Sequence, residues 1–69
     1  MKIKVNGEEK IIKLDPENAL LSIVLNSMGY KPNTIVVELT NLIINSIKWE
    51  KVKIKDGDNL EIVSIVGGG

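Results

Sequence analysis

Polar and apolar residues alternate from Lys2 to Val5, and this period of two predicts a strand with one buried face. Asn6-Gly7 follows at once, and because both positions tolerate a positive φ, the pair predicts a tight hairpin turn. A second strand is expected from Lys10 to Leu14. Ile11 points away from the other apolar residues of this strand, so the register stays open. The residues that fit one face of the hairpin are Ile3, Val5, Ile12 and Leu14.

Apolar residues recur every three or four positions between Glu17 and Met28, which predicts one amphipathic helix of about three turns. We expect Asp15 to cap this helix and Pro16 to be its first residue, where the missing N–H of proline costs nothing. Gly29 is expected to end it in the left-handed conformation. The apolar stripe, interpreted as core packing, consists of Leu20, Leu21, Val24, Leu25 and Met28.

The second half of the chain consists of expected strands and turns. Residues 45–49 are expected to form a single helical turn or an irregular crossover, and residues 51–55 alternate so that three lysines face water. The strands are expected at 34–39, 42–44 and 60–66, with turns at Thr40-Asn41 and over 56–59. On the first of these strands Ile35, Val37 and Leu39 share one face, and Thr34, Val36 and Glu38 share the other.

The order β-β-α-β-β-β is typical of an α+β fold. One mixed sheet of four to five strands packed on one helix buries both amphipathic surfaces, and the helix supplies the long crossover that a parallel pair of strands requires. The first and last strands are then expected to be parallel neighbours at the centre of the sheet. This is the β-grasp, or ubiquitin-like, arrangement. We expect residues 1–66 to form this single domain and residues 67–69 to form a flexible glycine tail.

Composition narrows the range of functions. Nine basic residues balance nine acidic ones, so the chain lacks the basic excess that a nucleic-acid binder needs. Without histidine or cysteine, the usual general base and thiol nucleophile are missing, and no disulfide or typical metal site can form. We therefore expect a protein that is not an enzyme and binds no metal. With no signal peptide or membrane-spanning run in the sequence, we expect a cytoplasmic protein without membrane contacts.

Gly67, Gly68 and Gly69 follow the last apolar residue of the chain, Val66. Glycines bury nothing and lose the most conformational entropy when ordered, so the fold has little use for them. A narrow enzyme channel, in contrast, can admit bare backbone where side chains would clash. A frayed terminus or a leftover linker is the simpler interpretation of the tail taken alone.

The residues upstream of the tail resemble the bacterial sulfur-carrier family of thiamine biosynthesis, ThiS. The resemblance rests on Trp49, the turn Asp56-Gly57-Asp58, the strand over 60–63 and the terminal glycines, at fitting distances, with support from residues 4–8. The chain departs from the family at Ile44-Asn45-Ser46, where many members have a Val-Pro-Arg-like stretch, and at Thr40, where an asparagine usually begins the turn. Trp49 is interpreted as a core residue and the aspartates as a turn.

The resemblance implies that the chain carries sulfur on Gly69. An E1-like adenylating enzyme would use ATP to adenylate the terminal carboxylate, a persulfide donor would supply sulfur to form a thiocarboxylate, and thiazole synthase would accept it. Gly67 and Gly68 would serve recognition of the tail. The carrier itself would hold no cofactor and would be monomeric on its own.

A partner surface is expected on the open face of the sheet, because Leu60 and Ile62 should face the helix. Exposed apolar residues on such a face indicate a docking patch, although they are also simply good strand formers. The expected surface consists of Val36, Glu61, Val63 and Ile65.

Three further functions stay open. A ubiquitin-like modifier would share the adenylation step but pass Gly69 to a lysine, and other sulfur carriers, such as the small subunit of molybdopterin synthase, share the fold and the glycine end. A regulatory β-grasp module, with the glycines only a cut linker, is the third possibility.

Overall fold

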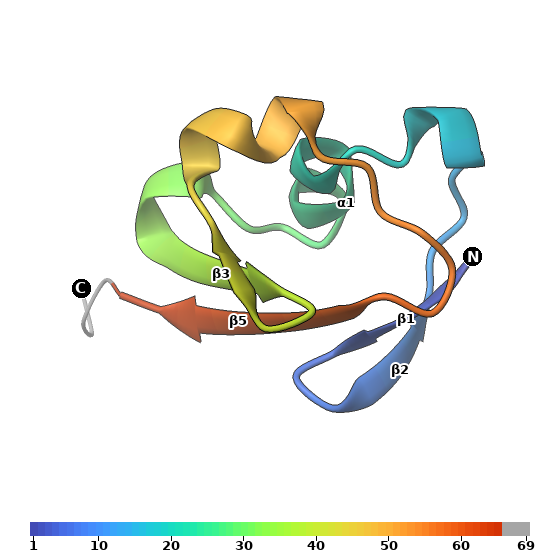
Figure 1. Cartoon of the computed structure of the whole chain (residues 1–69), viewed down its shortest axis with the longest axis horizontal. Coiled ribbons are helices and arrows are strands. Elements are labelled where there is room, and N and C mark those ends of the chain that lie inside the picture. The colour runs from blue at the N-terminus through green and yellow to red at the C-terminus, as the bar shows by residue number, and fades with distance from the viewer. Residues whose placement is uncertain (66–69) are drawn as a thin grey trace.

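The computed structural model describes residues 1–65, which form a five-stranded mixed sheet packed on one α-helix and three short 3₁₀ helices (Figure 1). The order of strands across the sheet is β2-β1-β5-β3-β4. The strands are β1 (Lys2–Val5), β2 (Glu8–Ile11), β3 (Ile35–Leu39), β4 (Leu42–Ile44) and β5 (Asn59–Ser64). The helices are η1 (Pro16–Asn18), α1 (Leu21–Ser27), η2 (Pro32–Thr34) and η3 (Ser46–Lys51).

The first and last strands are parallel neighbours at the centre of the sheet, as the sequence predicted. The backbone N–H of Lys4 donates to the Asp58 carbonyl at 2.9 Å, and that of Asn6 donates to the Leu60 carbonyl at 2.8 Å. All other neighbouring pairs of strands are antiparallel. The α+β class and the β-grasp arrangement are therefore confirmed.

The turn over 56–59, which precedes β5, forms hydrogen bonds with the start of β1. The Asp56 carboxylate accepts a hydrogen bond from the Lys2 N–H at 2.6 Å, and the Gly57 N–H donates to the Lys2 carbonyl at 2.7 Å. The Asp58 carboxylate accepts from the Lys55 N–H at 2.7 Å within the turn. Both carboxylates therefore serve backbone groups, which confirms their interpretation as turn residues.

The predicted helix over 17–28 is wrong at its start, because the segment divides into η1 and a two-turn α1. Leu20 between them has an extended backbone, with φ −75° and ψ 146°. Its neighbours bond to a distant segment: the Leu21 N–H donates to the Val52 carbonyl and the Ile54 N–H to the Ala19 carbonyl, both at 2.7 Å. These tertiary hydrogen bonds outweigh local helix propensity. Asp15 and Pro16 are the N-cap and first residue of η1, as predicted for the helix start, although the Asp15 side chain makes no capping bond.

The same contacts explain the outcome for residues 51–55. Within this segment Lys53 forms an isolated antiparallel bridge with Leu20. The alternation of the segment is real, since Ile54 is buried and all three lysines are exposed. The predicted strand over 10–14 is found earlier in the chain, at Glu8–Ile11, because the hairpin register pairs these residues with Lys2–Val5. Ile12 still joins the core, as expected.

Gly29, with φ +88°, ends α1 as predicted, and the Tyr30 N–H donates a hydrogen bond to the Leu25 carbonyl at 3.0 Å.

The core lies between the sheet and α1. Most of the buried side chains come from the inner faces of the strands and from one face of α1. The core cluster is Ile3, Val5, Ile12, Leu21, Val24, Leu25, Ile35, Val37, Trp49, Ile54, Leu60 and Ile62.

Trp49 closes this core from η3, as predicted, with 3% of its surface exposed. Asn45 caps η3, since its side chain accepts a hydrogen bond from the Ile47 N–H at 3.1 Å. The indole N–H of Trp49 donates to the Ile44 carbonyl at 3.0 Å, so the ring is buried without leaving its polar atom unpaired.

Asn6 continues the parallel pairing past the end of β1. Its carboxamide accepts from the Ile62 N–H at 2.6 Å and donates to the Ile62 carbonyl at 3.2 Å, across 56 positions of sequence. Asn6 also has φ 52°, as the hairpin turn requires. One side chain thus acts as a surrogate peptide unit for β5 where β1 has ended.

We predict that Asn6→Gly lowers the free energy of unfolding by about 1–3 kcal/mol, because it keeps the positive φ but leaves both Ile62 backbone groups unpaired. Urea unfolding followed by circular dichroism measures the change. Asn41→Gly is the matched control, since Asn41 has φ 69° in the other hairpin turn. Equal stability of the two variants would contradict the role given to the Asn6 carboxamide.

Trp49→Ala should cost about 3–5 kcal/mol of unfolding free energy, as is usual when a buried aromatic ring is truncated. The thermal midpoint by circular dichroism reports the loss. Ile47→Ala in the same helix, at a residue that is 83% exposed, should leave the midpoint nearly unchanged. A Trp49→Ala variant that melts like the parent would show that the ring does not support the core.

Candidate functional site

The open face of the sheet, on the side away from α1, gathers the residues expected to contact a partner. Leu60 and Ile62 of β5 are buried under the helix, so the alternation of the strand turns Glu61 and Val63 outward. Val63 is 59% exposed and Glu61 is half-buried. The predicted assignment of faces on this strand is confirmed.

An apolar group lies where β5 ends. Val63 pairs directly with Val36 of β3, which is half-buried. Beyond the strand, the Ile65 N–H donates to the Thr34 carbonyl at 2.9 Å, which continues the pairing with the β3 segment, and Ile65 is 57% exposed. Three apolar side chains from two neighbouring segments therefore stand at the edge from which the chain continues into residues 66–69.

Two carboxylates face each other beside this group. Glu61 of β5 lies opposite Glu38 of β3 in the antiparallel register, and within residues 1–65 neither makes an ion pair. Like charges in directly opposed positions destabilise a sheet. Ile43 of β4, 66% exposed, is paired with Glu38 on the other side. The result is an acidic pair framed by exposed apolar side chains.

Sequence reasoning missed two members of this surface, Glu38 and Ile43. Glu38 could have been included, because it shares the outward parity of Val36. Ile43 lies in a strand of three apolar residues, LII, where alternation gives no indication of the outward side chain. Only its pairing with Glu38 assigns it to the open face.

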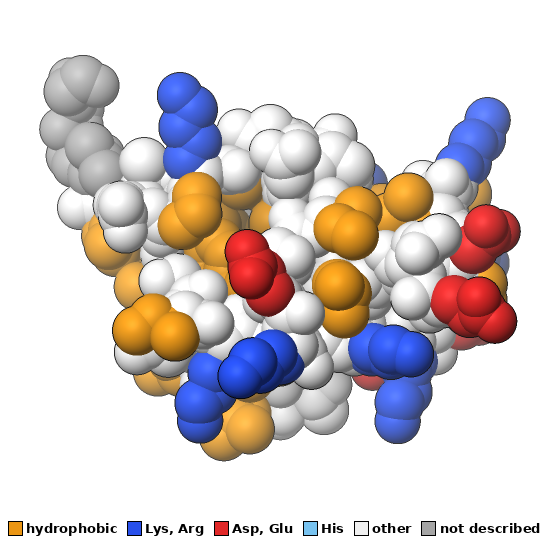
Figure 2. All heavy atoms as spheres, turned by 90° about the horizontal axis from the view of Figure 1, so that it is seen from above, with side chains coloured by type: hydrophobic (Ala, Val, Ile, Leu, Met, Phe, Trp, Pro, Cys, Tyr) orange, Lys and Arg blue, Asp and Glu red, His pale blue; other side chains and the backbone are white. Residues whose placement is uncertain are grey.

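The helix side of the molecule carries a different surface. Figure 2 shows this side with hydrophobic side chains in separate groups among lysines and acidic residues. Gly67, Gly68 and Gly69, the expected sulfur-carrying tail, lie outside the described residues. Within residues 1–65 no group of acidic side chains is arranged to hold a metal ion, and no helix in that range is long and apolar enough to cross a membrane.

The sheet order and the single crossover helix define a ubiquitin-like β-grasp protein. The model of the ThiS family matches residues 3–69. The chain therefore belongs to the ThiS family.

Solved structures share the fold along the whole chain. The crystal structure of the thiamine biosynthesis protein ThiS from Geobacter metallireducens is similar with a TM-score of 0.82 and 23% identity, covering 100% of both chains. A solution structure of a thiamine biosynthesis protein from the same organism has a TM-score of 0.79 and 24% identity, over 100% of this chain and 88% of that one.

Curated relatives differ in length. The uncharacterized protein ycf40 of Trieres chinensis is 44% identical over 46 residues, which are 67% of this chain and 63% of that protein. The thiazole synthase of Paramagnetospirillum magneticum is 32% identical over 69 residues, which are 100% of this chain but 20% of that protein. The ycf40 protein of Pyropia yezoensis is 30% identical, over 97% of this chain and 90% of its own length.

Proposed function

We propose that the chain is a sulfur carrier of thiamine biosynthesis, in which the carboxylate of Gly69 is adenylated and converted to a thiocarboxylate. The family match carries this proposal, because it extends through residue 69 and so includes the three glycines. The work of catalysis falls to the partner enzymes. This chain contributes a carboxylate and a docking surface, and its sequence has neither histidine nor cysteine.

The chemistry needs little from the carrier. A terminal carboxylate has a pKa near 3.3–3.7 and is ionised at neutral pH, so it can attack the α-phosphate of ATP without a general base. Pyrophosphate leaves and an acyl-adenylate forms. The terminal sulfur of a persulfide then bonds to the acyl carbon as AMP leaves. A thiol of the donor cleaves the sulfur–sulfur bond, which leaves the thiocarboxylate on Gly69.

Reach and docking support the same assignment. Four extended residues, 66–69, span at most about 13 Å, enough to bring the carboxylate into a cleft while the domain stays outside. The open face beside β5 offers the adenylating enzyme an apolar contact through Val63 and Ile65 and two carboxylates at Glu38 and Glu61. A partner with a basic residue set among apolar side chains would complement it.

The relative named thiazole synthase supports the choice of sulfur acceptor. The whole of this chain aligns with one fifth of that protein, so that polypeptide includes a segment similar to this chain. We therefore propose thiazole synthase as the acceptor, in the cytoplasm. A ubiquitin-like modifier would instead form an isopeptide with lysines of other proteins. Mass spectrometry of protein purified from its native host distinguishes the two, as a sulfur-for-oxygen mass gain or a ladder of conjugates.

Deleting Gly69 or replacing it with aspartate should abolish adenylation while leaving unfolding free energy within about 0.5 kcal/mol of the parent. Gly68→Trp should act in the same way, because the bulky ring blocks a narrow channel. Pyrophosphate release by the cognate adenylating enzyme measures the reaction. Normal release with the truncated chain would refute the assignment of Gly69.

Val63→Asp should weaken binding to the adenylating enzyme with an intact tail, because it removes apolar contact area and places a carboxylate where apolar side chains of the two proteins would meet. Titration calorimetry measures the affinity, and a urea melt checks that the fold is kept. Ile47→Asp is the matched control, since Ile47 is exposed on η3, away from the sheet face. Equal affinities of the two variants for the adenylating enzyme would show that the open face is not part of the interface.

A further inference from the structure

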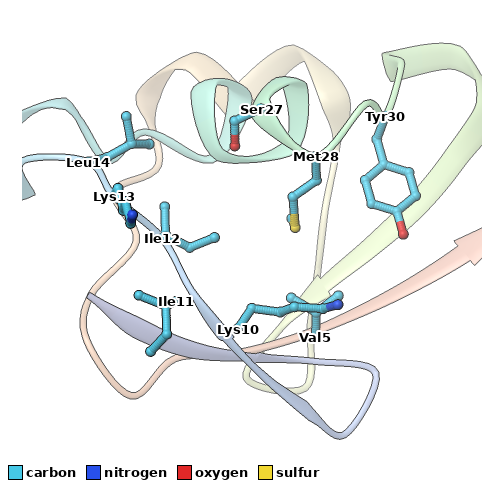
Figure 3. A pocket seen from close by; sticks show the side chains of 9 residues that line it. All are labelled: Val5, Lys10, Ile11, Ile12, Lys13, Leu14, Ser27, Met28 and Tyr30. Carbon is cyan, nitrogen blue, oxygen red and sulfur yellow. The ribbon is translucent and has the colours of Figure 1, made fainter.

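A groove of about 570 Å³ runs between the segment that follows β2 and the C-terminal end of α1. Its floor is apolar: Val5 and Ile12 are buried, and Figure 3 shows Ile12 and Met28 pointing into the same space, with the Tyr30 ring to one side. The volume lies within the range of ordinary ligand sites. The lining residues are Val5, Lys10, Ile11, Ile12, Lys13, Leu14, Ser27, Met28 and Tyr30.

A free strand edge borders this groove. β2 is the outermost strand on its side of the sheet, and all four of its residues are exposed. Ile12 and Met1 exchange two backbone hydrogen bonds, of 2.8 and 2.9 Å. Because such pairs alternate along an antiparallel ladder, the N–H and C=O groups of Glu9 and Ile11 point outward, away from β1.

Charge is unevenly distributed along the edge. Glu8 and Glu9 lie at the hairpin end, whereas Lys10 and Lys13 line the groove. The Lys10 ammonium is 3.8 Å from the Glu8 carboxylate, and its side chain stays 48% exposed. Within residues 1–65 Lys13 has no ion-pair partner. The far end of the groove is therefore cationic and its floor is apolar.

We infer that the β2 edge and its groove bind an extended segment of a partner protein as an added strand. Unpaired, outward-pointing amides beside an apolar groove suit β-strand addition, in which the backbone supplies affinity and alternate side chains enter the groove. The segment would carry apolar residues at alternate positions and acidic residues facing Lys13. A second copy of this chain, paired through the same strand, would place its own Lys10 on this inner face next to the Lys10 already there. The two like charges would repel each other, so an acidic partner segment suits this edge better than a second copy.

This surface is separate from the one proposed for sulfur transfer. Figure 1 shows the end of β5 at the left of the molecule, with β1 and β2 to its right along the longest axis. A segment bound at β2 would leave the open end of β5 accessible. Binding of a segment at the β2 edge and its groove requires no reaction at Gly69, so the two proposals can be tested independently.

The probe is a short fluorescein-labelled synthetic peptide in which two glutamates precede alternating valine and threonine, added to the full chain and followed by anisotropy and by amide NMR. We expect saturable binding below about 1 mM. The amide signals of Glu9, Ile11 and Lys13 should shift together with those of Met28 and Tyr30. A peptide with lysines in place of the glutamates should bind roughly tenfold more weakly.

Two variants test the two parts of the inference. Lys13→Glu should weaken binding of the glutamate peptide roughly tenfold and reverse the preference for charge, while Lys51→Glu, exposed on η3, should leave both unchanged. Ile11→Pro removes one outward N–H and no bond to β1, so it should also weaken binding, with a preserved NMR spectrum as evidence of folding.

Four results would overturn the inference. The first is absence of binding at about 1 mM peptide. The second is amide shifts confined to the open face around Val63. The third is a sedimentation mass of two chains for the parent that Ile11→Pro reduces to one, which would assign the β2 edge to a second copy. Equal affinity for the two peptides would refute the acidic partner.

Discussion

The parallel pairing of β1 with β5 is the interaction on which the rest of the structure depends. It joins the two ends of the described chain, and all the other strands and helices lie between them in the sequence. Both ends of β1 are reinforced by side chains. At the start of β1, the Asp56 carboxylate accepts a hydrogen bond from the Lys2 N–H. Just beyond its end, the Asn6 carboxamide forms two hydrogen bonds with the backbone of Ile62. Such contacts are distant in sequence, so closing them carries a large entropic cost.

The placement of α1 follows from this pair. A parallel connection must pass over one face of the sheet, and the buried stripe of α1 fills that face with Leu21, Val24 and Leu25. The segment over 52–54 then holds the entry to the helix through Leu21 and Ala19, so the helix is short and its direction is determined by tertiary contacts. The opposite face of the sheet stays uncovered, and there the acidic pair of Glu38 and Glu61 sits at a cost to stability.

Local patterns predicted the elements whose residues have one dominant environment. Alternation placed Ile35 and Val37 inward and Val63 outward, and the positive φ demanded by turns was correctly assigned to Asn6-Gly7 and Gly29. The predicted start of the helix was wrong because Leu20 forms a β-bridge with Lys53. The apolar spacing of a helix gives no information about such a distant partner. Of the candidate site, the outward side chains of β5 were predictable. The outward position of Ile43 and the groove beside β2 could not be predicted, because they depend on the register of strand pairing and on where β1 ends.

The central position of β5 has a mechanical consequence. A partner that drew residues 66–69 into a cleft, as we propose, would load β5, which β1 and β3 flank on its two sides. Load in that direction is shared among the lateral hydrogen bonds of two ladders at once, including the pair made by Asn6. A tail mounted on an edge strand could be peeled away one bond at a time. In this fold, tension on the tail would instead be transmitted to the central strand of the sheet.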